Sequence, residues 1–520
     1  MSDRIVILDF GSQFTQLIGR RIRDMHVYCE LLPWNASEAE AITPETVGII
    51  LSGGPQSIYA ENAPFIQDYI LKSELPILGI CYGMQALAHQ SGGKVASSTE
   101  HEYGLTRLEV PEENPLLHLG KQKVWMSHGD YVQKLPEGYI GIAHTTNTPY
   151  AAMANYAQSR FGLQFHPEVH ESQYGSEMIE NFVLKLCAAK PSWTSKNIIE
   201  ESLEQIRQQV GQGRVLSALS GGVDSAITTA LVQRAVGDRV TAVFIDTGLM
   251  RQGEAEQIEA NFRPILGDNL VTIDASERYF ARLQGVTDPE EKRIAIGELF
   301  IREFEAAVHD LGNFEFLAQG TIYPDVIESK GIGVDAAHRI KSHHNVAGLP
   351  KDMKFKLVEP LRLLFKDEVR SIGLELGLAS ELVWRQPFPG PGLAVRCLGE
   401  VTPERIATVR HADAILREEL EKADLMHVWH DEEGNTHGSS QAFATLIPVK
   451  SVGVMGDQRT YAETIVLRAV TSVDFMTADW ARLPMDILAL ISSRIVNEVI
   501  GVNRVVYDIS SKPPATIEWE

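Results

Sequence analysis

Short apolar runs alternate with amphipathic stretches over the first 190 residues of the chain. The runs 4–9, 47–51 and 75–80 are apolar at their centres, and each ends in a glycine-rich or polar turn. Short apolar runs separated by helix-like stretches are typical of strands that are buried on both faces of a parallel sheet. Later runs of strand character indicate that this sheet is mixed: 105–110, 124–126 and 162–165.

The pattern breaks at residues 188–194, Ala-Ala-Lys-Pro-Ser-Trp-Thr, which we interpret as a linker. A second series of strands followed by helices begins at 214–220 and continues through 240–246 and 314–318. This series predicts a second α/β unit with a parallel sheet.

A segment rich in proline and glycine at 384–391 predicts another boundary. After it, a helix-like stretch at 403–423 precedes strand-like runs at 446–454 and 465–470, which together predict a smaller α+β domain. The expected fold class is therefore α/β, with three domains: residues 1–190, 191–386 and 387–520.

The composition limits the kinds of function. Of 520 residues, 44% are hydrophobic and 22% are charged, as in ordinary soluble proteins, and no apolar run is long enough to span a bilayer. Because the first residues lead directly into a strand-like run, we expect a cytoplasmic protein without membrane contact. Four scattered cysteines without a CxxC pair argue against a disulfide framework and a zinc site. The net charge of −22 argues against nucleic-acid binding.

A candidate nucleophile is Cys81, in the segment Gly79-Ile-Cys-Tyr-Gly83. It follows a buried strand and precedes a helix-like run, so the segment has the form of a nucleophile elbow that carries a thiol. The flanking glycines permit a sharp turn, and a helix N-terminus stabilises a thiolate. Taken alone, a cysteine at the end of a buried strand is more often a small core residue.

Other residues of the first domain complete this chemistry. His166 can accept and return the proton of the thiol. Glu168, two positions later in an extended segment, can lie beside the imidazole ring and orient it. The turn Ser52-Gly-Gly-Pro55 and the Tyr82 amide can direct N–H groups at an oxyanion. A single His-Pro-Glu is usually a surface turn, but the combination of features favours a catalytic site.

With these motifs the first domain resembles the class I, triad-type glutamine amidotransferases. The resemblance implies a mixed sheet flanked by helices, a γ-glutamyl thioester on the thiol, and release of ammonia from glutamine. Cys81, His166 and Glu168 match the Cys-His-Glu triad of the family, Gly54 matches its oxyanion glycine, and Gln85 matches the position that holds glutamine. The preference for glutamine rests on this resemblance.

A second candidate site is the turn Ser220-Gly221-Gly222-Val223-Asp224-Ser225, before a helix expected at 226–235. Adjacent glycines let successive amides point into one anion-binding nest, and the helix N-terminus adds positive potential. Ser220 and Ser225 can donate hydroxyl hydrogen bonds, and Asp224 can bind a Mg²⁺ ion that bridges phosphates. The motif lacks Gly-Lys-Ser/Thr and is therefore not a Walker A loop, whereas an isolated Ser-Gly-Gly would as often be a tight turn.

Further residues are expected near this turn. Val243 lies in the next strand, whose carboxyl end at the sheet edge suits the adenosine half of ATP. Lys366 begins a helix and can reach a pyrophosphate, although a lone lysine there is more often a solvated charge. The basic run at 338–356 in an acidic chain predicts a lid over phosphates, with a solvated loop as the alternative.

The complete motif resembles the PP-loop of the N-type ATP-pyrophosphatases, which cleave ATP between the α and β phosphates. With the segments 387–396, 453–461 and 511–520, the chain resembles the glutamine-hydrolysing GMP synthase family along its whole length. This resemblance implies amination of xanthosine monophosphate (XMP) to GMP through adenylyl-XMP, with glutamine or ammonia, ATP and Mg²⁺ as reactants. It also implies a homodimer formed by the last domain and an XMP site at Arg293, Arg396, Gln458, Lys512, Thr516 and Glu518.

Two other kinds of protein stay open. One is another amide- or sulfur-transferring pyrophosphatase, such as an NAD synthetase, whose typical glutaminase has a different fold, or a tRNA thiolase, which usually has a more basic surface and cysteine pairs. The other is a catalytically silent nucleotide-binding regulator, against which the presence of Cys81, His166, Glu168 and Asp224 counts.

Overall fold

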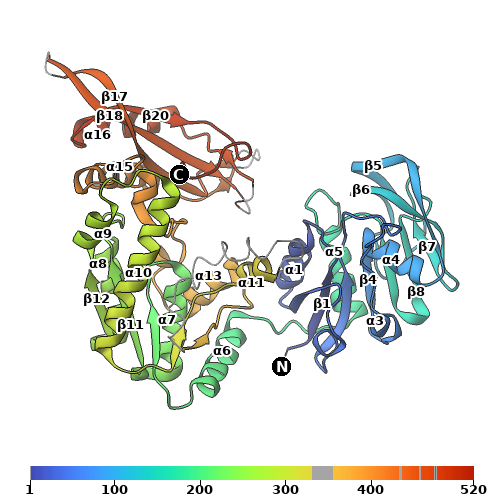
Figure 1. The fold of residues 1–520 in the computed structure, drawn as a ribbon. Helices are drawn as coiled ribbons and strands as arrows, with labels where there is room; N and C mark the ends of the chain where they lie inside the picture. Colours follow the sequence, from blue (N-terminus) through green and yellow to red (C-terminus); the bar gives the residue numbers. More distant parts are fainter. Residues whose placement is uncertain (1, 331–354, 432–435, 456–457, 473–474, 476) are drawn as a thin grey trace. The chain divides into compact units, whose positions relative to one another are not determined.

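The chain is described by a computed structural model that covers residues 2–330, 355–431, 436–455, 458–472, 475 and 477–520 (Figure 1). The expected lid at 338–356 lies almost wholly outside the described residues. The chain divides into two compact units, of which the first comprises residues 1–198 and 327–336 and the second comprises 199–326 and 337–520. The expected limits of three domains stay predictions.

The first unit is built on a seven-stranded sheet in which the strands β2, β1, β3, β4 and β9 run parallel and β8 and β7 are antiparallel. The predicted mixed sheet is therefore confirmed. In sheet order the strands are β2 (Tyr28–Pro33), β1 (Arg4–Asp9), β3 (Thr46–Leu51), β4 (Ile77–Ile80), β9 (Arg160–Leu163), β8 (Ala152–Asn155) and β7 (Ile140–Ala143).

The runs at 105–110 and 124–126 do not join that sheet. They belong to two long antiparallel strands, β5 (Lys94–Val110) and β6 (Gly120–Lys134), which form a separate two-stranded sheet with one isolated bridge from Glu109 to His144. Their inward side chains, such as Leu108 and Val124, still pack into the core of the unit. The apolar pattern thus predicted the strands correctly but not their partners, because burial of one face does not specify which sheet a strand joins.

Helices cover both faces of the first sheet, because side chains alternate along β1. Ile5 and Ile7 pack with α1 (Thr15–Asp24) and α5 (Gly175–Glu180), whereas Val6 and Leu8 pack in a second cluster on the other face. This second cluster includes residues of α2 (Glu38–Ala41), α3 (Asp68–Lys72) and α4 (Tyr82–Gln90). Two cores on opposite faces are the layers of a doubly wound α/β fold.

The second unit contains a five-stranded, wholly parallel sheet: β12 (Leu270–Asp274), β11 (Val240–Asp246), β10 (Val215–Ala218), β13 (Phe316–Ala318) and β14 (Lys356–Val358). The helices of this part are α6 (Ser195–Val210), α7 (Val223–Val236), α8 (Glu254–Leu266), α9 (Ser276–Leu283), α10 (Pro289–Leu311), α11 (Tyr323–Lys330), α13 (Lys366–Glu375) and α14 (Ser380–Val383). Helix α7 begins three residues before the expected position 226, because Gly222 is already its extended N-cap.

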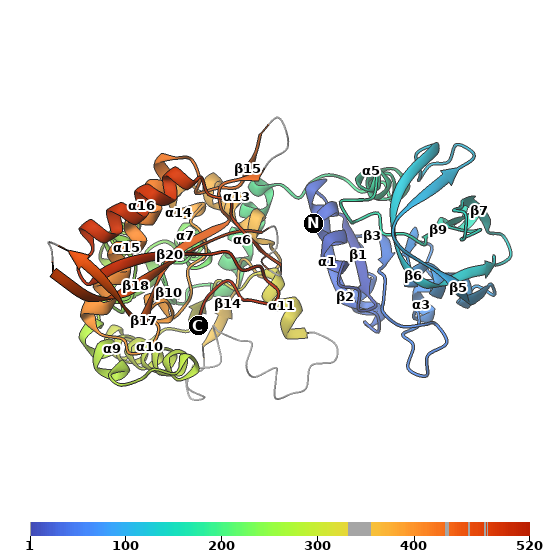
Figure 2. The ribbon, with the colours of Figure 1, turned by 90° about the horizontal axis from the view of Figure 1, so that it is seen from above.

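The carboxyl-terminal part adds a sheet in which β18 pairs with β17, β19 and β20. Figure 2 shows β17, β18 and β20 side by side. The elements are α15 (Pro403–Lys422), β15 (Trp429–His430), β16 (Thr436–His437), β17 (Gln441–Met455), β18 (Gln458–Thr471), β19 (Asp479–Trp480), α16 (Met485–Glu498) and β20 (Val502–Asp508). The strands expected at 446–454 and 465–470 fall within β17 and β18, and the helix expected at 403–423 is α15, which ends one residue earlier.

The chain end is tied down and does not fray. In both views it lies beside α10 (Figures 1 and 2), where the Glu520 carboxylate is 2.7 Å from Lys292 Nζ. Lys292 is fully buried and also donates to the Cys397 carbonyl at 2.8 Å. Among the described residues, no helix is long and apolar enough to cross a bilayer.

Candidate active sites

Cys81 lies in a strained turn at the carboxyl end of β4. Its backbone has φ of 51° and ψ of −107°, a conformation that a residue with a side chain rarely adopts. A Cβ on Gly79 would lie 2.6 Å from Gly83, and a Cβ on Gly83 would overlap the Leu51 carbonyl. The tight path of the chain therefore requires both glycines, and it lifts the thiol to the N-terminus of α4.

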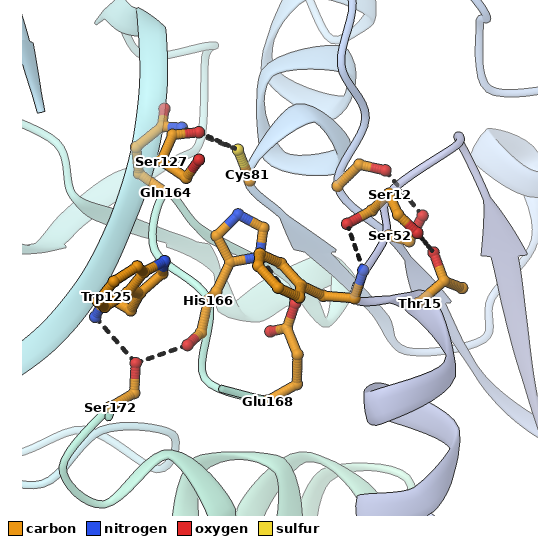
Figure 3. Close-up of polar contacts among 12 residues, drawn as sticks. Ser12, Thr15, Ser52, Cys81, Trp125, Ser127, Gln164, His166, Glu168 and Ser172 are labelled. Atoms are coloured by element: carbon orange, nitrogen blue, oxygen red, sulfur yellow. Dashed lines mark hydrogen bonds and ion pairs between the residues drawn. The ribbon is translucent and has the colours of Figure 1, made fainter. Parts of the chain in front are cut away.

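His166 and Glu168 form a buried pair beside the thiol. The His166 Nδ1 and Glu168 Oε1 atoms are 2.7 Å apart, and the ring lies between Cys81 and Glu168 (Figure 3). Burial of the ring works to lower the pKa of His166, but the hydrogen bonds with Cys81 and Glu168 outweigh it and raise the pKa to about 10. A protonated ring beside the sulfur favours a thiolate.

The neighbourhood fixes the orientation of the His166 ring. Phe14 packs its edge against the ring with centroids 5.2 Å apart. The Ser172 hydroxyl donates to the His166 carbonyl at 2.6 Å and accepts from the Trp125 amide at 2.9 Å (Figure 3). A Cβ on Gly53 would lie 3.0 Å from the ring, so the glycine leaves room for the imidazole.

The thiol opens into a cavity of about 530 Å³, which Gly54, Gln85 and His166 also line. Within the described residues, the amides of Gly54 and Tyr82 donate to no protein acceptor, so both are free to bind an oxyanion. The Tyr82 side chain points elsewhere, because its hydroxyl donates to the Pro64 carbonyl at 2.7 Å. Gln85 Nε2 donates to the Asp130 carbonyl at 2.7 Å and thereby joins α4 to β6.

His128, in the cavity wall, belongs to a buried pair that the sequence analysis missed. His128 Nε2 is 3.4 Å from Glu102 Oε2, and the Thr145 and Thr148 hydroxyls donate to the same carboxylate at 2.9 and 2.6 Å. Burial works to raise the pKa of Glu102, but hydrogen bonds from His128, Thr148 and Thr145 outweigh it and lower that pKa. The only signal in the sequence was the polar run Ser-His-Gly-Asp at 127–130, directly after the apolar residues 124–126.

The second candidate site lies at the carboxyl end of β10. Gly221 has φ of 80°, and Gly222 begins α7, so Val223, Asp224 and Ser225 form the first helical turn. The Ser220 and Ser225 hydroxyls are 3.1 Å apart. The predicted strand, glycine turn and helix are thus present, and the turn lies at a helix N-terminus, where anions are favoured.

Two other predicted residues differ in their relation to this turn. Lys366 is the first residue of α13, and its Nζ is 2.7 Å from both carboxylate oxygens of Asp224. It therefore lies at the turn and is not a merely solvated charge. Val243 is buried in β11, and its carbonyl accepts from the Leu219 amide at 2.9 Å, next to the start of the loop.

The residues expected to bind XMP lie in several places in the second unit. Arg396 is fully buried, and its Nη2 is 2.8 Å from Glu518 Oε1, so these two are in direct contact. Lys512 donates to the Phe475 carbonyl at 2.8 Å, and Thr516 is exposed in the same carboxyl-terminal segment, 511–520, here called the tail. Arg293 lies in α10, within 3.8 Å of Glu290. Gln458 begins β18, but its side chain lies outside the described residues.

Comparison with known proteins identifies families along most of the chain. The model for class-I glutamine amidotransferases matches residues 6–186, the NAD synthase model matches 196–317, and the model for the GMP synthase C-terminal domain matches 430–519. A solved glutamine amidotransferase from Thermotoga maritima is 20% identical, with a TM-score of 0.29, and the match covers 40% of this chain and 86% of that one.

Two curated relatives match from end to end. The GMP synthase (glutamine-hydrolysing) of Thermomicrobium roseum is 56% identical, and the match covers 100% of this chain and 97% of the relative. That of Carboxydothermus hydrogenoformans is 52% identical over 100% of both chains. An NAD synthetase or a tRNA thiolase is thereby disfavoured. The chain belongs to the GMP synthase (glutamine-hydrolysing) family.

Proposed function

We propose that this protein forms GMP from XMP, with nitrogen taken from glutamine and energy from cleavage of ATP to AMP and pyrophosphate. The observation that carries the proposal is the presence, in one chain of this family, of a strained thiol beside a His-Glu pair and of a glycine turn for phosphates. Each lies at the carboxyl ends of parallel strands, where α/β sheets bind their ligands.

In the first unit, the Cys81 thiolate attacks the carboxamide carbon of glutamine. The amides of Gly54 and Tyr82 stabilise the oxyanion, and His166 donates its proton to the leaving nitrogen, which departs as ammonia. A γ-glutamyl thioester remains on the sulfur. His166 then takes a proton from water as the water attacks the thioester, and glutamate leaves with the thiolate restored. Glu168 holds the ring in position throughout.

In the second unit, the oxygen on C2 of XMP attacks the α-phosphorus of ATP, and pyrophosphate leaves. The amides of the 220–225 turn and Lys366 neutralise the charge that develops on the phosphates, so catalysis there consists of positioning and electrostatics. Adenylation converts the C2 oxygen into part of a good leaving group. Ammonia then adds at C2, AMP departs with the oxygen, and loss of a proton gives GMP.

Mg²⁺ is proposed to accompany ATP and to neutralise phosphate charge. Within the described part of the chain, no group of three or more His, Cys, Asp or Glu side chains could hold a metal. A single carboxylate, Asp224, lies at the turn. This donor set fits a Mg²⁺ ion held by one carboxylate and by phosphate oxygens, and it does not fit a closed protein site.

The XMP site and the subunit contact are proposed for the last part of the chain. Arg293, Arg396, Gln458, Lys512, Thr516 and Glu518 are its candidate XMP contacts. An exposed apolar strip on β17 and β18, in which Val452 pairs with Tyr461 across the strands and Val454 is 75% exposed, supports a homodimer formed by this part. Three domains (1–190, 191–386 and 387–520) and a cytoplasmic location complete the proposal.

The decisive assay supplies XMP, Mg²⁺, ATP and glutamine and measures GMP, AMP, pyrophosphate and glutamate. We expect equal amounts of GMP, AMP and pyrophosphate, and GMP formation that persists when ammonia replaces glutamine. A silent nucleotide-binding regulator would bind nucleotides without releasing AMP. Release of AMP that depends on nicotinic acid adenine dinucleotide instead of XMP would favour the NAD synthetase alternative.

A further inference from the structure

Arg385, in the Pro-Gly-rich segment that follows α14, connects three separate parts of the second unit. Its Nη1 donates to the Gly221 carbonyl at 2.6 Å, its Nη2 pairs with Glu254 at the start of α8, and its guanidinium lies 5.6 Å from the centre of the Phe388 ring. The side chain is only 11% exposed. Such a buried arginine with partners on three segments fixes their relative positions.

The contact with Gly221 determines where a loop amide points. In a trans peptide the carbonyl and the following N–H point in opposite directions. Because Arg385 holds the Gly221 carbonyl from one side, the Gly222 amide is directed to the other side, where it donates to the Ser220 hydroxyl of the turn at 3.4 Å. A Cβ on Gly221 would lie 2.6 Å from Ile258, so the loop has little room to rotate this peptide in any other way.

The second connection leads from Phe388 toward the tail. Arg251 lies 4.6 Å from the centre of the Phe388 ring, and Arg396 lies 5.2 Å from it, so three guanidinium groups surround one ring. Arg396 is bonded to Glu518 of the tail at 2.8 Å. The Phe388 ring is therefore held between the phosphate turn and the tail.

Carboxylates complete this cluster. Glu254 Oε2 accepts from the Arg251 amide at 3.1 Å, and Arg251 Nε donates to Asp413 Oδ2 at 3.1 Å. Asp413 in turn accepts from the Ala444 amide of β17 at 3.1 Å. An unbroken series of buried polar contacts thus runs from Gly221 to the carboxyl-terminal sheet, and loss of one arginine leaves a buried carboxylate without its opposite charge.

We propose that Arg385 is a positioning residue for both nucleotide sites: it orients the phosphate-binding turn through Gly221 and, through Phe388, the segment that supports the tail. The inference rests on the proposed function, because it takes the turn as the site for ATP phosphates and the tail as part of the XMP site. Arg385 touches neither reacting atom. Its substitution should therefore act on substrate binding at both sites.

The first test compares Arg385→Lys with the matched control Arg405→Lys. Arg405 has the same kinds of partners, since it pairs with Glu463 at 3.1 Å and donates to the Leu398 and Glu400 carbonyls, and its side chain is 16% exposed. With ammonia as the nitrogen donor, Arg385→Lys should raise KM for ATP by about tenfold, the size of one lost charge-assisted hydrogen bond. Arg405→Lys should leave KM for ATP within about twofold.

The second test uses Phe388→Leu, which keeps an apolar side chain and removes the ring face. Although Phe388 contacts the turn only through Arg385, we expect this variant to raise KM for ATP as well as for XMP. In the double variant with Arg385→Lys, the effects on ATP should not add, because both act through one contact. Thermal midpoints of all variants are measured to separate weakened binding from unfolding.

Four outcomes are distinguishable. Equal kinetics of Arg385→Lys and Arg405→Lys in an active protein would overturn the positioning role, as would additive effects of Arg385→Lys and Phe388→Leu. A change in kcat with unchanged KM for both nucleotides would also contradict it. If the unsubstituted protein released no AMP from ATP and XMP, the proposed function itself would fail.

Discussion

Replacement of Glu168 by glutamine tests how the thiol is activated. Glutamine keeps the shape and an acceptor oxygen 2.7 Å from His166 Nδ1 but removes the negative charge. The pKa of His166, raised from the ordinary 6.5 to about 10 by Cys81 and Glu168 against burial, should fall in the variant by about 1 to 3 pH units, the effect of one close opposite charge.

The sign of this change sets the pH profile. A protonated His166 favours the thiolate and supplies the proton to the leaving nitrogen, so activity is lost as the pH rises through the pKa of the ring. The alkaline limb of kcat/KM for glutamine should therefore move to lower pH in Glu168→Gln. Loss of a charge-assisted hydrogen bond should also lower kcat by about 10- to 100-fold.

The assay follows release of glutamate between pH 6 and 10.5, and ammonia-dependent GMP formation by the same preparation reports whether the second unit is intact. A variant with a wild-type rate of glutamate release and an unmoved alkaline limb would refute the role of Glu168 as the residue that keeps His166 protonated. Loss of both activities would indicate damage to the fold and would be checked by thermal unfolding.

Three further substitutions address the remaining groups. Cys81→Ala should abolish release of glutamate and leave ammonia-dependent GMP formation within about twofold; loss of both would contradict separate sites. Asp224→Asn should lower release of AMP by about 100-fold with either nitrogen donor, and near-normal release would reject a metal role for Asp224. Glu102→Gln should raise KM for glutamine and lower the thermal midpoint at pH 7. Because the pKa of Glu102 is lowered in the folded protein, its carboxylate adds stability in full above the ordinary pKa of 4.5, and this stability is lost as the pH falls. A difference in thermal midpoint from wild type that persists in acid would contradict this reasoning.

Local motifs explain why much of both sites could be predicted from the sequence. Cys81 and the 220–225 turn each occupy a few consecutive residues between a strand and a helix, so the backbone alone places their groups. The strand β11 has the predicted limits for the same reason, since apolar residues fill all its positions except Thr241 and the final Asp246. In such segments, the local structure can be predicted from neighbouring residues alone.

Contacts between distant residues could not be predicted in this way. Glu102 meets His128 because the two are opposite each other in the β5–β6 pairing, and that register includes a shift just before Glu102. Arg385 reaches Gly221 across 164 positions of the chain. A Pro-Gly-rich segment has no hydrophobic periodicity, so its sequence cannot distinguish a buried arginine from a solvated one. Only the packed structure reveals the partners of Arg385.

The Asp224–Lys366 contact bears on the proposed binding of nucleotide at the second site. Both carboxylate oxygens are 2.7 Å from Lys366 Nζ, so one cation occupies the group that is proposed to hold Mg²⁺. The two side chains are 28% and 39% exposed, and a pair so accessible to water is weak enough to open at little cost. ATP offers each partner an alternative, because Lys366 can bind a phosphate oxygen while Asp224 binds the metal. The ion pair thus neutralises both charges in the absence of nucleotide. When nucleotide binds, the contact between the two side chains is replaced by two others, from Lys366 to a phosphate and from Asp224 to the metal.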